Sequence, residues 1–131
     1  MSLVKVVAAV IQHPQKGVLI AKRPDHLHQG GLWEFPGGKL EVGESPLEAL
    51  QRELHEELGI SITSAQPFLK LHHDYSDKSV ELDVWSVERF EGAAVGREGQ
   101  QIRWVDPAEL SEYDFPAANT PILQALSLSK P

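Results

Sequence analysis

The chain contains no cysteine. Disulfide bridges, thiolate metal sites and cysteine nucleophiles are therefore excluded. This composition fits a reducing compartment, although it does not by itself require one. Any catalysis or metal binding must rest on other side chains.

Long hydrophobic runs are also missing. The apolar run near the start is "VVAAVI", residues 6–11, and it is flanked by Lys5 and by Gln12 with His13. A membrane-spanning helix needs about 20 apolar residues, and the core of a signal peptide needs about 7–15. We therefore expect a soluble, cytoplasmic protein with no membrane partner.

Positive charge is scarce, with 12 Lys and Arg residues against 19 Asp and Glu residues and a formal net charge of −7. Proteins that follow a nucleic-acid backbone need clustered Lys and Arg, so we expect no stable nucleic-acid binding. A small phosphorylated ligand could still bind, provided that a divalent cation lies between the two sets of negative charges.

The length of 131 residues suits one hydrophobic core, and we expect a single domain over residues 1–131. Apolar segments separated by the turn sequence "HPQKG" predict an opening hairpin. Further strands are predicted at residues 67–75, 79–90 and 100–106, with a loop at 24–31 and a short strand entering a glycine loop at 32–41.

Helix-end signals frame residues 46–58. Ser45 suits the N-cap, Pro46 the first helical position, and Glu48 completes an S-x-x-E capping box. Gly59 supplies a stop signal at the other end. Leucines 47, 50, 54 and 58 recur at steps of three and four and predict one apolar stripe facing the core.

A second helix is predicted over about residues 121–129. Thr120 followed by Pro121 is typical of a cap and a first helical turn, and a "DFPAAN" loop precedes it. Strands therefore mix with one central and one C-terminal helix. The fold class expected is α+β with a mixed sheet.

The central helix carries three glutamates on one face, Glu53, Glu56 and Glu57. Like charges at these spacings destabilise a helix by about 0.2–0.5 kcal/mol per pair. One interpretation is a solvated face, with Arg52 offsetting the repulsion through contacts to Glu48 and Glu56. The other is a site for a hard divalent cation, which prefers carboxylate oxygens together with phosphates and water.

The residues upstream favour the cation site. Gly38, Glu44 and the segment "RELHEELGI" at 52–60 together match the pattern G-x5-E-x7-R-E-U-x-E-E-x-G-U, where U is aliphatic. This pattern resembles the signature of the Nudix hydrolases, here residues 38–60, with every defined position present. The resemblance implies a Nudix fold, an α/β/α sandwich around a mixed sheet, and a loop-helix-loop that binds Mg²⁺ or Mn²⁺. Family members cleave nucleoside diphosphates linked to another group.

The resemblance also implies roles for residues of the motif. Glu53, Glu56 and Glu57 are expected to bind the metal, together with a carbonyl such as that of Gly37. Glu53 is our candidate general base, and Arg52 is expected to orient it or its neighbours. Three further positions complete the set: Gly38 and Gly59 for backbone turns, and Glu44, expected to be structural. Lys39 could stabilise developing charge, although a solvated loop lysine is the equal alternative.

Several other segments are similar to the MutT branch of the family, which removes oxidised guanine nucleotides. They are "EFPGGK" at 34–39, "VERFEG" at 87–92, "GREGQ" at 96–100 and "DFPAAN" at 114–119. This resemblance implies that Asn119 reads the purine edge and Phe35 lines the base pocket. Arg23 is expected at the phosphate or sugar end, and Glu98 in the metal site or assisting proton transfer.

Plainer interpretations remain for these residues. Asn119 could be a turn or cap residue, Phe35 a core aromatic, and Glu98 an exposed loop carboxylate. Lys78 stands where the branch has a basic residue that helps to close over the nucleotide, here Lys in place of Arg. A bidentate contact would therefore not transfer intact.

The predicted function is Mg²⁺-dependent hydrolysis of 8-oxo-dGTP, with 8-oxo-GTP as a second substrate, to the monophosphate and pyrophosphate. Such an enzyme would protect DNA replication by cleansing the nucleotide pool. The alternatives are a Nudix hydrolase of another nucleotide, such as a dNTP or ADP-ribose, and a non-catalytic domain that senses a nucleotide. We expect a monomer, with a dimer as the alternative.

Overall fold

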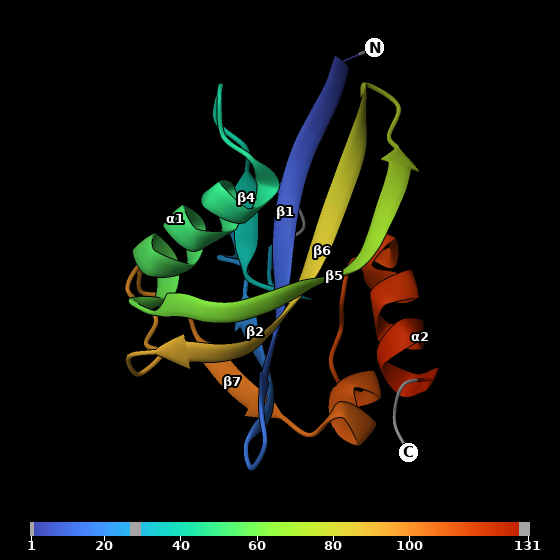
Figure 1. Ribbon diagram of the computed structural model, residues 1–131. Helices are drawn as coiled ribbons and strands as arrows, with labels where there is room; N and C mark the ends of the chain where they lie inside the picture. Colours follow the sequence, from blue (N-terminus) through green and yellow to red (C-terminus); the bar gives the residue numbers. More distant parts are fainter. Residues whose placement is uncertain (1, 27–29, 129–131) are drawn as a thin grey trace.

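The computed structural model describes residues 2–26 and 30–128 (Figure 1). Its strands are β1 (Ser2–His13), β2 (Gly17–Lys22), β3 (Trp33–Glu34), β4 (Gly37–Lys39), β5 (Ser61–Asp74), β6 (Lys78–Glu91) and β7 (Ile102–Val105). Its helices are α1 (Pro46–Leu58) and α2 (Thr120–Leu128), with the short 3₁₀ helices η1 (Pro107–Glu112) and η2 (Ala117–Asn119). The α+β class and the opening hairpin are as predicted.

Strand β1 organises the sheet. Its first ten residues pair in parallel with β6, its middle pairs antiparallel with β4, and its end pairs antiparallel with β2. The strand order is β3-β2-β1-β6-β5, with β4 added on β1 and β7 added on β2. The sheet is therefore mixed, as predicted.

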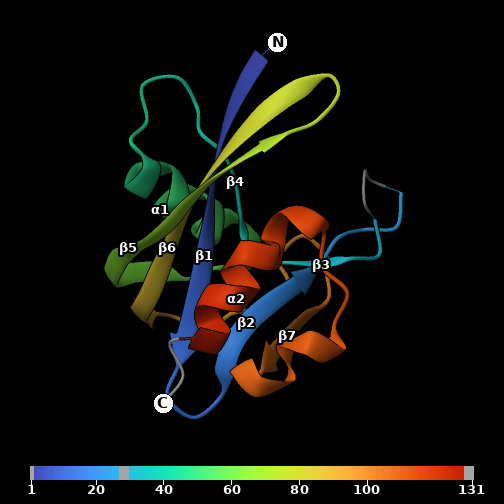
Figure 2. The ribbon, with the colours of Figure 1, turned by 90° about the vertical axis from the view of Figure 1, so that its right-hand side faces the viewer.

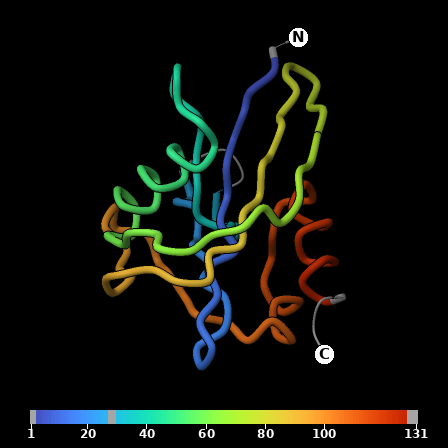
Figure 3. The backbone as a smooth tube through the Cα atoms, in the orientation of Figure 1, coloured from blue at the N-terminus to red at the C-terminus, as the bar shows by residue number. Residues whose placement is uncertain are grey.

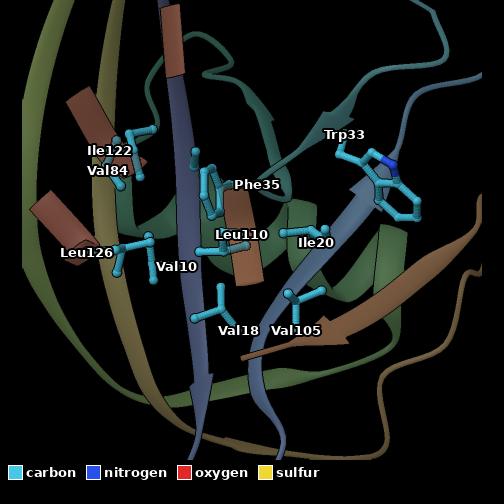
Figure 4. Packing of buried hydrophobic residues seen from close by; sticks show 11 residues of the cluster. Val10, Val18, Ile20, Trp33, Phe35, Val84, Val105, Leu110, Ile122 and Leu126 are labelled. Atoms are coloured by element: carbon cyan, nitrogen blue, oxygen red, sulfur yellow. The ribbon is translucent and has the colours of Figure 1, made fainter. Parts of the chain in front are cut away.

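Alternation along β1 separates two cores. Val7, Ala9 and Ile11 pack with the buried face of α1, whereas Ala8 and Val10 pack with residues of α2 and η1. Successive side chains of a strand point to opposite faces, so one buried strand can serve both layers. Figure 2 shows α1 and α2 on opposite sides of β1, and Figure 4 shows the core on the α2 side. The layers form the predicted α/β/α sandwich.

Helix α1 begins and ends where its sequence signals predict. The Ser45 side chain accepts a hydrogen bond from the Glu48 backbone N–H, and the Glu48 carboxylate accepts one from the Ser45 N–H. At the other end Gly59 takes a left-handed conformation with φ of 74°. A residue with a Cβ rarely adopts this conformation, so Gly59 ends the helix cleanly.

The predicted apolar stripe of α1 is wrong at its first position. Leu50, Leu54 and Leu58 are fully buried, but Leu47 is 42% exposed and Ala49 is buried instead. Residues 41–48 are all exposed or half-buried, so the helix meets the core only from its second turn. Leu47 lies on the same face of the helix as the other leucines, as predicted. It is exposed because the first turn of the helix extends beyond the core.

Leu54 and Leu47 give a matched test of this packing. Leu54→Ala should lower the free energy of unfolding by about 2–5 kcal/mol, because it leaves a cavity in a core that lies between α1 and the sheet. Leu47→Ala should change it by less than about 0.5 kcal/mol, as is usual for exposed sites. Urea unfolding of both variants measures the difference, and equal costs would contradict the assigned burial.

The C-terminal segment is more helical than predicted. Helix α2 begins at Thr120, one residue before the predicted start, and residue 129 of the prediction lies outside the described residues. The predicted "DFPAAN" loop contains η2, and residues 107–112, to which no helix had been assigned, form η1. Among the described residues, no helix is long and apolar enough to cross a membrane.

Strands β5 and β6 are both longer than predicted and form a hairpin of 14 residues on each side. Figure 3 shows this hairpin extending from the body of the protein next to the start of β1, with which β6 pairs. The register shifts between Ile62 and Leu69, which is typical of β-bulges that bend a strand. The outer half of the hairpin thereby forms one wall of a cavity.

Candidate functional site

A cavity of about 490 Å³ opens between the β5–β6 hairpin, strands β1, β2 and β4, the end of α1 and η2. Segments distant in sequence contribute to it, because the sheet order places β1 and β6 next to each other and adds β4 on β1. Eight of the predicted site residues line it: Arg23, Phe35, Gly37, Gly38, Lys39, Glu57, Glu98 and Asn119. The structure therefore brings together residues from most of the chain.

Three predicted residues do not line this cavity, namely Arg52, Glu53 and Glu56 of α1. Glu53 still reaches the glycine loop, because a Cβ built on Gly38 would collide with the Glu53 carboxylate. The absence of a side chain at Gly38 is what lets this carboxylate approach the loop. Glu56 is more open, with its side chain half exposed.

The Arg52 guanidinium connects the acidic residues of the motif. It donates to both carboxylate oxygens of Glu44 at 2.8 and 2.9 Å, and its Nη1 lies 3.2 Å from Glu53 and 3.1 Å from Glu56. Its Nη2 also donates to the Lys39 carbonyl at 3.0 Å. One side chain thus fixes the glycine loop to the helix.

One of the two contacts predicted for Arg52 is wrong. The contact to Glu56 is present, but the Glu48 carboxylate caps α1, and Arg52 pairs with Glu44 in its place. Glu44 also accepts a hydrogen bond from the Glu41 backbone N–H. The Arg52 hydrogen bonds hold the pKa of Glu44 down at about 2, so this carboxylate stays charged. Its contacts are those of a residue that orients Arg52.

Glu57 occupies the most acidic part of the cavity. Its pKa is raised to about 8, mainly by burial and in addition by the nearby charges of Glu53, Glu98 and Glu34. The Gly37 backbone N–H hydrogen-bonds to the Glu57 carboxylate and opposes the shift. Burial also raises the pKa of Glu53. The Glu57 carboxylate is therefore repelled by three other carboxylates, those of Glu53, Glu98 and Glu34.

The loop at residues 94–100 carries Glu98 to this region because it is tied to the end of α1. The Gln100 side chain donates to the Glu57 carbonyl at 3.0 Å, and the Arg97 backbone N–H donates to the same carbonyl at 3.0 Å. The Gln100 side-chain oxygen also accepts from the Glu98 N–H at 2.9 Å. Glu98 itself is exposed, and it lines the cavity.

The cavity is also lined by an aromatic ring and by a side-chain amide from η2. Phe35 is both a core residue and a lining residue, and its ring stacks on that of Phe115 at 5.2 Å between centroids. Asn119 lies at the end of η2, where its backbone N–H bonds to the Pro116 carbonyl. One cavity therefore carries carboxylates together with aromatic and amide groups.

The donor set fits a divalent cation. A site in which burial and neighbouring carboxylates raise the pKa of Glu57 to about 8 would be relieved by a hard cation bound to oxygen. In the described part of the chain, no three His, Asp or Glu side chains converge closely enough to hold a metal as they stand. Arg52 accounts for part of this, because it draws Glu53 and Glu56 toward itself.

Stability should therefore fall with rising pH when no divalent cation is present. The pKa of Glu57 is about 4.5 unfolded and about 8 folded, so between these values the native state binds more protons than the unfolded state. The free energy of unfolding should drop by roughly 2–4 kcal/mol from pH 5 to pH 8.5. Urea unfolding in EDTA measures this.

The control for this pH effect is Glu57→Gln, which keeps the shape of the side chain and removes the titration. Its stability should depend much less on pH than that of the wild type, whereas the exposed Glu112→Gln should leave the wild-type slope unchanged. Parallel curves for the wild type and Glu57→Gln would contradict the assigned burial of this carboxylate.

Sequence reasoning did not single out four other residues of the cavity wall, Glu34, His73, Tyr75 and Gln100. Glu34 and Gln100 lie in two of the segments that are similar to the MutT branch, 34–39 and 96–100. The similarity of these segments did not predict the contacts of either side chain. His73 and Tyr75 lie on the hairpin with their rings 4.6 Å apart. Their side of the strand follows from period-two alternation, but the hairpin's bend toward the cavity does not.

Comparison with known proteins agrees with this geometry. The model of the NUDIX domain family matches residues 7–125. The chain belongs to the Nudix family. It is a Nudix hydrolase with the Nudix fold, and the resemblance predicted from the motif at residues 38–60 is confirmed.

Relatives of known name cover nearly the whole chain. One is the 8-oxo-dGTP diphosphatase of Escherichia coli, 37% identical over 126 residues, which are 96% of this chain and 98% of the relative. Another is the CTP pyrophosphohydrolase of the same species, 40% identical over 95% of this chain and 92% of the relative. A solved structure from work on MutT of Aliivibrio salmonicida and Vibrio cholerae is 43% identical, with a TM-score of 0.82 and coverage of 97% and 99%.

Proposed function

We propose that this Nudix hydrolase converts 8-oxo-dGTP, and as a second substrate 8-oxo-GTP, into the monophosphate and pyrophosphate. The observation that carries the proposal is that one cavity is lined by the carboxylates of Glu57 and Glu98 and also by Phe35 and Asn119. A nucleoside triphosphate has two parts that suit these groups, a polyphosphate for a cation held by carboxylates and a base for the aromatic and amide side chains. The relative named 8-oxo-dGTP diphosphatase supports the choice of base.

We assign the metal site to Glu53, Glu56, Glu57 and Glu98 with the Gly37 carbonyl, and we propose Mg²⁺ as the cofactor, with Mn²⁺ as the alternative. Such a cation would neutralise the polyphosphate and lower the pKa of a bound water. Its ligands are oxygen atoms, which these ions prefer.

Proton transfer is assigned to Glu53. Its pKa is raised by burial, so its carboxylate is a better base than an exposed one, and Arg52 holds it in place at 3.2 Å. Glu53 takes the proton of the attacking water, and the water oxygen bonds to the scissile phosphorus. The P–O bond that joins the monophosphate and pyrophosphate parts of the substrate breaks, and both products are released. Lys39, exposed on the cavity rim, is assigned to the developing negative charge.

Base recognition is assigned to Asn119 and Phe35. A side-chain amide offers a donor and an acceptor together and can read one edge of a base. Phe35 supplies an apolar wall that is fixed by its stacking on Phe115. Gly38 lets the loop approach the substrate, and Arg23 is assigned to the sugar or phosphate end.

The test is pyrophosphate release by the purified protein with Mg²⁺ and 8-oxo-dGTP. Release well above that from dGTP supports the proposal. Turnover of another nucleotide with none of 8-oxo-dGTP would contradict the substrate while leaving the hydrolase intact.

A specific observation makes CTP another candidate substrate, since the relative named CTP pyrophosphohydrolase is 40% identical, against 37% for the relative named 8-oxo-dGTP diphosphatase. CTP therefore belongs in the assay beside dNTPs and ADP-ribose. A smaller pyrimidine would leave part of the cavity unfilled, and the ratio of kcat/KM for 8-oxo-dGTP and CTP decides between them. The single domain over residues 1–131, the monomeric state and the cytoplasmic location stay predictions.

A further inference from the structure

Arg23 and Glu34 form an ion pair on the cavity wall, and the roles assigned above do not include this contact. The Arg23 Nη1 atom lies 2.9 Å from the Glu34 Oε1 atom. The two side chains are 30% and 32% exposed, and both line the cavity. Glu34 has no role in the assignments above, although it faces the same space as Glu57 and Glu98.

The sheet register explains why these side chains meet. Glu34 of β3 lies directly opposite Ala21 of β2, and Arg23 follows two residues later on the same face. The backbone around Arg23 is held by its N–H donating to the Leu32 carbonyl at 2.9 Å and its carbonyl accepting from Gly31 at 3.0 Å. Long side chains reach such diagonal neighbours, so this local geometry brings the pair together.

A carboxylate at this position is unfavourable on its own. Burial is the main cause that raises the pKa of Glu34, and the charge of Glu98 adds to it. Glu34 in turn helps to raise the pKa of Glu57, so it adds negative charge to a cavity in which an anionic substrate would bind. Only its contact with Arg23 offsets these costs among the causes identified. Since the Glu34 carboxylate would repel an anionic substrate, any benefit from it must come through its contact with Arg23.

That benefit is orientation of the guanidinium. A mobile arginine side chain loses much of its rotamer entropy when a ligand fixes it. A carboxylate that already holds it removes much of this cost from binding, because a guanidinium has five N–H donors and can serve two partners. Arg23, which lines the cavity, is then held in place before the nucleotide arrives.

We propose that Glu34 is a positioning residue, which holds the Arg23 guanidinium toward the sugar–phosphate part of the nucleotide. This inference rests on the proposed function only in requiring a nucleotide in the cavity, whichever base it carries. Glu34 acts through Arg23 and not on the reacting atoms. Its removal should weaken binding more than it slows chemistry.

The experiment is a double-mutant cycle with KM and kcat measured separately for Glu34→Ala, Arg23→Ala and the double variant. Glu34→Ala should raise KM about tenfold, the usual size for loss of one charge-assisted hydrogen bond, with kcat nearly unchanged. In the Arg23→Ala background the same change should have almost no effect. Glu34→Gln, which keeps an acceptor, should restore most of the wild-type KM.

Three results would overturn the proposal. The first is an unchanged KM in Glu34→Ala, and the second is a fall in kcat alone. The third is an equal effect of Glu34→Ala with and without Arg23, which would show an independent action. Glu34→Met, which keeps an unbranched side chain of similar length and removes the acceptor, replaces Glu34→Ala if that variant fails to fold. The exposed Glu112→Ala is the matched control expected to behave as wild type.

The two proposals fail in distinguishable ways. Loss of the substrate proposal appears in the wild type, as turnover of CTP or another nucleotide in place of 8-oxo-dGTP. The cycle is then run on that nucleotide, and its additivity still judges the role of Glu34.

Discussion

Replacing Glu53 with glutamine is expected to reduce kcat by about 10²–10⁴-fold while nucleotide binding persists. Glutamine has almost the same shape and can still bond to Arg52, but it cannot accept a proton at neutral pH. The carboxylate approaches Gly38 and lies 3.2 Å from the Arg52 Nη1, so the variant should keep the local geometry. Pyrophosphate release gives kcat, and calorimetric titration of a nucleotide gives binding.

The same variant separates the classes of function. A hydrolase loses turnover and keeps binding, whereas a nucleotide sensor shows no turnover even in the wild type. Glu112→Gln, an exposed change on η1, controls for loss of one negative charge. A Glu53→Gln protein with the kcat of the wild type would contradict the assigned base and direct attention to Glu98.

Gly38→Ala should lower kcat by about 100-fold with little loss of stability. The added Cβ would overlap the Glu53 carboxylate, which is the end of a flexible side chain and can move aside. The fold therefore tolerates the methyl group, but the base is displaced, and a shift of about 1 Å can cost about 100-fold in rate. Steady-state kinetics and thermal unfolding of the same preparation measure the two effects.

Gly43 offers the matched control. It lies in the same loop region with φ of 85°, and a Cβ there would meet nothing within 4 Å. Gly43→Asn should keep this turn, because asparagine tolerates the left-handed conformation, and it should keep kcat. Equal loss of activity in both variants would mean that loop rigidity, and not access of Glu53 to Gly38, limits the reaction.

Capping signals in the sequence predicted the ends of helix α1 correctly, because each signal depends only on neighbouring residues. The capping box of Ser45 and Glu48 and the left-handed Gly59 set both ends of α1 to the residue. Helix η1 has a comparable local signal that did not enter the prediction. Asp106 is its N-cap, and the Asp106 side chain accepts a hydrogen bond from the Ala108 N–H. Exposure of Leu47 could not be predicted, since it depends on where the helix axis meets the sheet.

The site was predicted through the family motif and not through its geometry. No local pattern shows that Gln100 ties its loop to the Glu57 carbonyl, or that the β5–β6 hairpin bends toward β1 and β2. Glu34 was missed for the same reason. Its partner Arg23 is 11 positions away, and their contact exists only because β2 and β3 pair in one register.

The most direct test of the account is the ratio of kcat/KM for 8-oxo-dGTP to that for CTP, measured with Mg²⁺ in the wild type and in Asn119→Ala. We predict a high ratio in the wild type that falls by about 10-fold or more in the variant, because a buried edge contact of the base is lost. A wild-type ratio below one, or a ratio that Asn119→Ala leaves unchanged, would contradict the assignment of this cavity to an oxidised guanine nucleotide.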